Sequence, residues 1–140
     1  MATLEEYRNP DFVKACDVEL EAFVAANSGV NTILITTPDG FTISSAVKDD
    51  NKHNMDNLAA VGSTIFALGA SASDQLELGV CNSVTIENQQ GRIYICAIEG
   101  GKDKSLVLFL ETSQKAMLAT ILHASRRLVE AVTKKMDLIG

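Results

Sequence analysis

Residues 30–47 read VNTILITTPDGFTISSAV, and this stretch decides how the rest of the chain can fold. Val30–Thr36 is rich in β-branched residues, and residues 41–47 alternate in the way strands do. Between them, Thr37-Pro38-Asp39-Gly40 is a strong turn signal, because proline presets φ and glycine accepts a positive φ. The stretch therefore predicts a β-hairpin and, with it, an antiparallel sheet.

Helices and further strands are predicted on both sides of this hairpin. Upstream, Asn9-Pro10-Asp11 is a good helix start, and apolar residues recur at helical spacing from Phe12 to Phe23. Downstream, residues 55–76 place apolar side chains and two glycines on one helical face. A last amphipathic helix is expected to begin near Ser113. Three strands lie between these two downstream helices, at residues 83–87, 92–99 and 105–112.

The predicted order is α-β-β-α-β-β-β-α, which indicates an α+β fold with a five-stranded antiparallel sheet. Residues 105–112, SLVLFLET, are almost continuously apolar, so this strand should be central. With 140 residues, the chain has the size of one domain. We expect a leader at residues 1–10, the domain at 11–136 and a tail at 137–140.

Composition and charge exclude several classes of protein. The net charge of −6 argues against a nucleic-acid or anionic-membrane partner, since both require a positive field. Residues 57–73 are uncharged, but their serines, threonine and glycines make them too polar for membrane insertion. The N-terminus has no apolar stretch behind basic residues, and the three cysteines are widely spaced. These features indicate a cytoplasmic protein with reduced thiols.

The sequence contains no arrangement typical of a catalytic, cofactor or metal site. The run from Gly100 to Ser105, GGKDKS, lacks phosphate-loop spacing and lies between two strands. His53 and His123 have no nearby nucleophile, and Arg126-Arg127 is either a solvated pair or a contact for an acidic partner. We therefore expect no enzyme activity and no cofactor.

The helix predicted at residues 55–76 is the informative feature. A five-stranded sheet is about 24 Å wide at about 4.8 Å per strand. One helix is about 10 Å across, so a single helix leaves part of its sheet face uncovered. The outward side of this helix is small and uncharged, which permits close helix–helix approach or is simply a tolerant exposed surface. Its members are Ala60, Ser63, Thr64, Ala67, Ala70 and Ser71.

The strand at residues 83–87 points to the same conclusion. It is short and lacks the lysine or proline that protects an edge strand, so it could pair with its own copy across a two-fold axis. A homodimer interface is therefore predicted along this strand and the outward side of the helix. The strand contributes Ser83, Val84, Thr85, Ile86 and Glu87.

The chain resembles the roadblock/dynein light chain family of bacterial type. The resemblance rests on the order of elements and on the hairpin from Gly29 to Ser45, with support from residues 55–76 and 105–133. It implies a profilin-like sheet in spatial order 2-1-5-4-3, with the first and third main helices on one face and the second on the other. It also implies dimers built through the third strand and second helix, and partnership with small Ras-like GTPases. Such dimers can stimulate GTP hydrolysis without an arginine finger.

Two functional hypotheses follow. The leading one is a non-enzymatic, homodimeric regulatory or scaffold module that binds a small Ras-like GTPase and modulates it. The alternative is a sensor domain that binds a small ligand between sheet and helix.

Overall fold

The computed structural model describes residues 2–48, 53–101 and 103–139 and contains one five-stranded antiparallel sheet. The strand order is β2-β1-β5-β4-β3, as the family resemblance implies. The strands are β1 (Val30–Thr36), β2 (Thr42–Val47), β3 (Ser83–Asn88), β4 (Gly91–Glu99) and β5 (Ser105–Ser113). The helices are α1 (Leu4–Tyr7), α2 (Pro10–Ala26), α3 (Met55–Gln75) and α4 (Leu118–Lys135), followed by the 3-10 turn η1 (Met136–Leu138).

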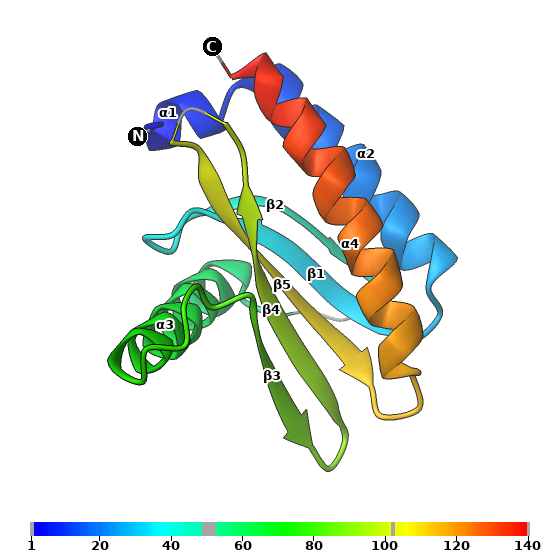
Figure 1. The fold of residues 1–140 in the computed structure, drawn as a ribbon. Helices are drawn as coiled ribbons and strands as arrows, with labels where there is room; N and C mark the ends of the chain where they lie inside the picture. The colour runs from blue at the N-terminus through cyan, green and yellow to red at the C-terminus, as the bar shows by residue number, and fades with distance from the viewer. Residues whose placement is uncertain (1, 49–52, 102, 140) are drawn as a thin grey trace.

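The sheet lies between two helical layers. Helices α2 and α4 run side by side over one face, and α3 alone covers the other (Figure 1). Strand β5 is central, with β1 and β4 as its neighbours, and this confirms the prediction from its apolar sequence. Phe109 of β5 lies opposite Leu34 of β1 and Ile95 of β4, so these three side chains share one face.

The core beneath α2 and α4 is the larger of two. The α2 residues Phe12, Cys16, Leu20 and Phe23 are buried, and they follow the helical spacing seen in the sequence. Asn9 begins α2 by accepting hydrogen bonds from the backbone N–H groups of Asp11 and Phe12. Strand and α4 side chains complete this core, including Leu106, Leu108, Leu110, Ile121, Leu128 and Val132.

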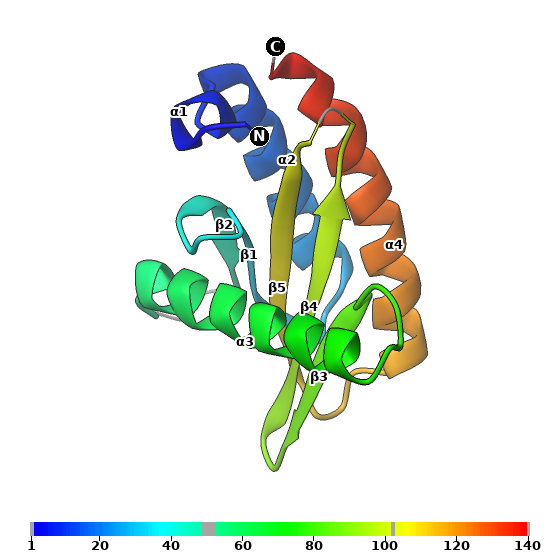
Figure 2. The same ribbon diagram turned by 60° about the vertical axis from the view of Figure 1, so that its left-hand side comes forward.

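The core beneath α3 is smaller and has five buried members, Leu34, Ala59, Ile95, Val107 and Phe109. Helix α3 lies across the strands, with its C-terminal end on the β3 side of the sheet (Figure 2). Two inward-facing glycines let the helix lie close to the sheet. A Cβ at Gly62 would be 2.6 Å from Cδ2 of Phe109, and one at Gly69 would be 2.7 Å from Cγ2 of Val84.

The described ends of the chain differ from the expected leader and tail. Residues 4–7 form α1, capped by Thr3 and Glu6, and Tyr7 is buried. The Tyr7 hydroxyl donates to the carbonyl oxygen of Ser105 at 2.9 Å and accepts from its N–H at 2.7 Å. Ile139 is also buried against the larger core. Tyr7 and Ile139 therefore attach both described ends of the chain to the larger core.

The last helix begins later than expected. Strand β5 continues to Ser113, and a turn follows in which the N–H of Ala116 donates to the carbonyl oxygen of Ser113. Helix α4 then begins at Leu118. Within the described residues, no helix combines the length and the apolar character needed to cross a membrane.

Candidate functional site

Exposed apolar side chains gather on and after α3. Nine large hydrophobic residues are exposed among those described, and five of them lie between Val61 and Val80. The most exposed of these five are Leu76 at 70%, Leu78 at 71% and Val80 at 87%. The sequence pattern placed Leu76 on the buried face of the helix, and the structure corrects this, because α3 ends at Gln75 and Leu76 only caps it. Exposed apolar side chains concentrated on one part of a surface are a common feature of protein–protein interfaces.

One flank of α3 carries a regular apolar row, which we call the α3 seam. Its members are Leu58, Val61, Ile65, Leu68 and Ala72, spaced alternately three and four residues apart. Leu58 and Ile65 are half-buried, whereas Val61, Leu68 and Ala72 are exposed. This spacing is the one at which two helices pack against each other along a shared seam. Sequence reasoning missed the seam, although its three-four spacing was readable.

The predicted small residues lie on the other flank and on the top of α3. Ala60, Ser63, Thr64 and Ala67 line a shallow groove beside the turn between β1 and β2. Ser63 is buried within the chain, Ala70 is half-buried, and Ala60, Thr64, Ala67 and Ser71 are exposed. The hydroxyls of Ser63 and Thr64 both donate to the carbonyl oxygen of Ala60, at 3.1 and 2.8 Å. Because these donors are already satisfied, covering them costs less free energy than covering free hydroxyls.

Strand β3 is an edge of the sheet, as predicted. Ser83, Thr85 and Glu87 are exposed, while Val84 and Ile86 are half-buried on the α3 face. The Glu87 carboxylate pairs with Arg92 of the neighbouring strand β4. Edge strands present unpaired backbone groups that can extend a sheet into another chain. The other edge, β2, differs because Arg8 donates to the carbonyl oxygen of Thr42 at 3.1 Å.

The end of α3 and strand β3 form one continuous surface. Gly69 packs on Val84, so the helix passes directly over the edge strand, and Cys81 lies beside the same glycine. Helix and strand residues that are far apart in the sequence therefore meet at the edge of the sheet. The predicted interface combines these two elements, and the structure places them next to each other.

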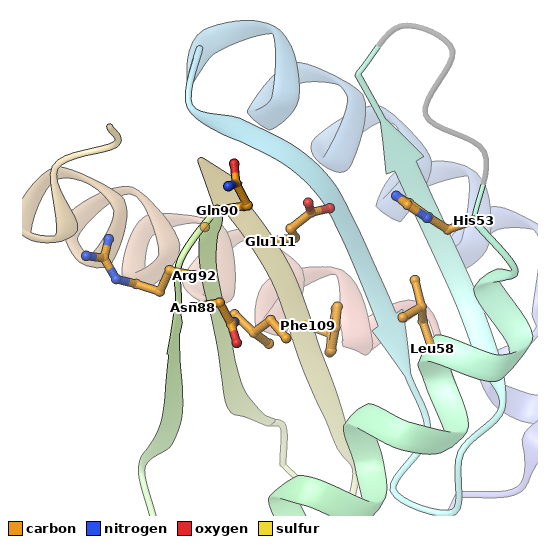
Figure 3. A pocket seen from close by; sticks show the side chains of 9 residues that line it. His53, Leu58, Asn88, Gln90, Arg92, Phe109 and Glu111 are labelled. Atoms are coloured by element: carbon orange, nitrogen blue, oxygen red, sulfur yellow. The ribbon is translucent and has the colours of Figure 1, made fainter. Parts of the chain in front are cut away.

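A pocket of ≈ 280 Å³ lies on the part of the sheet that α3 leaves uncovered. Its apolar wall is formed by Leu58, Ile93 and Phe109. Figure 3 shows His53, Gln90 and Glu111 around these apolar side chains, with Arg92 pointing away. One Glu111 carboxylate oxygen accepts a 2.7 Å hydrogen bond from the Thr32 hydroxyl, which fixes that side chain. The pocket is therefore mainly an apolar hollow beside the α3 seam.

The cysteines are divided between the two faces of the sheet. Cys16 and Cys96 belong to the larger core, and burial raises the pKa of the Cys16 thiol to about 12 and of the Cys96 thiol to about 11. Cys81 is half-buried at the end of α3. Arg126 and Arg127 are exposed on α4. Among the described residues, no group of three or more His, Cys, Asp or Glu side chains is placed to hold a metal ion.

Comparison with known proteins gives a consistent result. The family described as Roadblock/LC7 domain matches residues 17–101, which is more than half of the chain. No curated protein sequence matches. A Roadblock/LC7 domain from Streptomyces avermitilis superposes with a TM-score of 0.74 at 20% identity, covering 84% of this chain and 94% of that one.

Two MglB structures are also similar in fold, one of them described as a gliding protein. MglB from Thermus thermophilus gives a TM-score of 0.78 at 15% identity, covering 90% of this chain and 91% of that one. An MglB solved in a tetrameric arrangement gives 0.80 at 14% identity, covering 92% and 93%.

Proposed function

Because this chain belongs to the Roadblock/LC7 domain family, we propose that it is a regulatory or scaffold module that acts as a homodimer and binds a small Ras-like GTPase. The observation that carries the proposal is that the exposed apolar residues of the α3 seam lie next to the edge strand β3, where α3 crosses Val84. In this proposal the module has no catalytic activity of its own. It changes the activity of its partner by binding to it through its folded surface.

The geometry of β3 restricts how two copies can pair. Directly opposed residues of antiparallel strands point to the same face of a sheet. A two-fold axis perpendicular to the sheet keeps both α3 helices on one face. The axis must therefore pass at a residue of β3 and not between two residues. For the fullest overlap of Ser83–Asn88 with its copy, that residue is Thr85 or Ile86.

The same axis brings the two α3 helices together. Each helix crosses its own β3 at Val84. Rotation about Thr85 or Ile86 offsets the two helices along the strand by two or four residues, which is about 7–14 Å. Packed helices lie about 8–10 Å apart, so this range includes the distance at which side chains interdigitate. The flank of α3 that faces the Asn88 end of β3 carries Leu58, a member of the α3 seam, so the α3 seams of the two copies are the surfaces that meet.

Self-association is tested by light scattering at micromolar concentration. We expect about 30 kDa, twice the 15.0 kDa of one chain. Leu68→Asp and Thr85→Asp should each give a folded monomer, because they place charge in the seam or at the axis. Val18→Asp and Thr120→Asp, exposed on the far helices, should remain dimeric. A monomeric native chain would refute the homodimer.

A disulfide test examines the strand pairing directly. In a Cys81→Ser background, either Thr85→Cys or Ile86→Cys should form a disulfide-linked dimer under mild oxidation, since a residue on the axis faces its own copy. Cys16 and Cys96 are buried and should not compete. Failure of both variants in a chain that scatters as a dimer would place the interface elsewhere.

Binding to a GTPase is supported by the family and by the fold shared with MglB proteins. It is tested by measuring GTP hydrolysis by a Ras-like GTPase of the same organism with and without this protein. We expect the hydrolysis rate to change with the native dimer and not with Leu68→Asp. No binding to any GDP- or GTP-loaded GTPase of that class would remove the regulatory part of the proposal.

The pocket supports the alternative of a small-ligand sensor. Its volume of ≈ 280 Å³ is just below the range for small-molecule sites, about 300–1,000 Å³. A thermal-shift screen with nucleotides and metabolites distinguishes the two functions. A ligand that stabilises the native chain and loses its effect in Ile93→Asp would favour the sensor.

A further inference from the structure

Residues 76–80, LELGV, carry a conformational constraint that ordinary connecting loops lack. The N–H of Leu78 donates to the carbonyl oxygen of Ser73 at 2.9 Å, and that of Glu77 donates to Asp74 at 3.0 Å. These two bonds form a Schellman motif, which usually has glycine at the position with positive φ. Here Glu77 occupies it, with φ 57°. The backbone of this segment is therefore held in one shape against an unfavourable local preference.

The shape turns apolar side chains away from the chain. In a Schellman motif, the residue after the left-handed position usually packs against the last turn of the helix. The corresponding Leu78 is 71% exposed, so it does not make that contact fully. Leu76 and Val80 are exposed as well. The bonds of the motif fix the backbone as far as Leu78, so Leu76 and Leu78 are preorganised for contact, because little further conformational entropy is lost when they are covered.

The same chain also has an apolar pocket that could receive these side chains. The pocket wall of Leu58, Ile93 and Phe109 lies over the end of the sheet where β3 and β4 join, beside Asn88 and Gln90. Ile86 lies opposite Ile93 and extends the apolar area toward the edge. One chain therefore carries both an apolar projection and an apolar hollow, on the same face of its sheet but at opposite ends of β3.

The proposed two-fold axis brings the projection of one copy to the hollow of the other. Strand β3 runs antiparallel to its copy, so the residues before Ser83 in one chain lie beside Asn88 in the other. Helix α3 continues from Gly69, over Val84, to Gln75, which is about 9 Å further. Two strand spacings are about 9.6 Å. With the axis at Thr85, the end of α3 thus reaches over β3 and toward β4 of the second copy at the level of Ile86 and Ile93, which are paired in the sheet. With the axis at Ile86, it lies at the level of Asn88 and Gly91, which line the same pocket.

We propose that the 76–80 segment of each copy closes the apolar pocket of the other copy, with Leu76 and Leu78 covering Ile93. The inference rests on the proposed homodimer and adds a specific contact to it. The pocket is open in a single chain, and in the symmetric dimer each of the two pockets is closed by the other copy. The pocket is filled by a second copy of this chain, because the 76–80 segment and the pocket are both apolar and the axis that pairs the two β3 strands brings them together.

Disulfide trapping between two differently labelled chains tests the contact. In a Cys81→Ser background, chains carrying Leu76→Cys or Leu78→Cys are mixed with chains carrying Gln90→Cys. We expect a disulfide-linked heterodimer in at least one mixture under mild oxidation. The single variants alone, and mixtures of Gln90→Cys with Leu138→Cys, should stay unlinked, since Leu138 is exposed beyond α4 at the other side of the molecule.

Self-association gives an independent measurement. The double variant Leu76→Asp/Leu78→Asp should weaken dimerisation by at least about tenfold, because burial of one large apolar side chain alone is worth about that much. Val18→Asp, another exposed apolar position, should leave the dissociation constant unchanged.

The outcomes separate this contact from the dimer itself. A native chain that remains monomeric refutes the homodimer and the contact with it. A native dimer that gives no crosslink in either mixture, and whose dissociation constant is unchanged in the double aspartate variant, refutes only the contact. Circular dichroism of the double variant confirms that it is folded, and the crosslink still tests the contact if that variant does not fold.

Discussion

The two faces of the sheet differ in how fully helices cover them. On one face, α2 and α4 together cover a core that contains Phe12, Leu20, Leu108 and Val132 at less than 5% exposure. On the other, α3 covers a core with five buried members, and Leu58, Ile65, Phe66, Val84 and Ile93 remain half-buried around it. The apolar side chains of the first face are buried within the single chain, whereas the second face leaves apolar area exposed to water.

In the proposed homodimer, this difference separates a face that stabilises the single chain from a face that contacts the second copy. Apolar area left in water is unfavourable by about 25 cal/mol per Å², so an exposed seam and an uncovered pocket favour association. The larger core provides the stability that lets α3 keep an incomplete face. We therefore expect substitutions beneath α2 and α4 to act on folding, and those around α3 to act mainly on self-association.

The largest expected effect compares two phenylalanines on opposite faces. Phe12→Ala removes a fully buried side chain from the larger core and should lower the free energy of unfolding by about 3–5 kcal/mol. Phe66→Ala removes a half-buried side chain beneath α3 and should lower it by roughly half as much. Urea unfolding at a concentration where the chain is monomeric measures both.

The comparison fails if Phe66→Ala destabilises the monomer as strongly as Phe12→Ala. That result would mean that α3 completes its own core without a second copy. Repeating the measurement at a higher chain concentration shows how much stability the α3 face gains from self-association.

A smaller effect is expected at the contact between α3 and the sheet. Gly62→Val places side-chain atoms where even a Cβ would lie 2.6 Å from Phe109, so the helix must move outward. Such overpacking costs about 1–3 kcal/mol, which unfolding experiments can measure. Gly101→Val is the matched control, because a Cβ there meets nothing within 4 Å. Equal effects at both glycines would show that the close approach of α3 is not a constraint.

The fold could be predicted because its determinants are local. The Thr37–Gly40 turn and the flanking alternation fixed the hairpin, and the apolar run from Leu106 to Leu110 fixed the central strand. Boundaries were less certain where signals were weak. Met117 gives α4 no side-chain cap, so nothing in the sequence marked its late start. The burial of Tyr7 depends on the backbone of Ser105, far along the chain, and local patterns do not show such contacts.

The sequence identified the helix and the strand that make up the candidate site, but it identified their exposed apolar residues less well. Small size directed attention to Ala60 and Ser63, but Ser63 is buried beside the β1–β2 turn. The seam residues Val61 and Leu68 were passed over because sequence alone does not say which of two apolar flanks faces the sheet. Only the position of Gly62 over Phe109 defines the inward direction and leaves the seam on the open flank.

The smallest effect concerns the thiols, which also differ between the two faces. In the larger core, burial raises the pKa of Cys16 to about 12 and of Cys96 to about 11, from an ordinary value of 9.0. Above pH 9 the unfolded chain loses thiol protons that the folded chain keeps, so the free energy of unfolding falls as pH rises. The fall approaches about 1.4 kcal/mol per pH unit for each thiol between pH 9 and about 11, and stability from this source is complete below pH 9.

Cys16→Ala should therefore lower the slope between pH 9 and 10, since one of the two buried thiols with a raised pKa is gone. Urea unfolding at several pH values measures the slopes. An unchanged slope in Cys16→Ala would mean that water reaches Cys16 in the larger core. The face covered by α2 and α4 would then be less completely buried than its side chains indicate, and it would differ less from the α3 face.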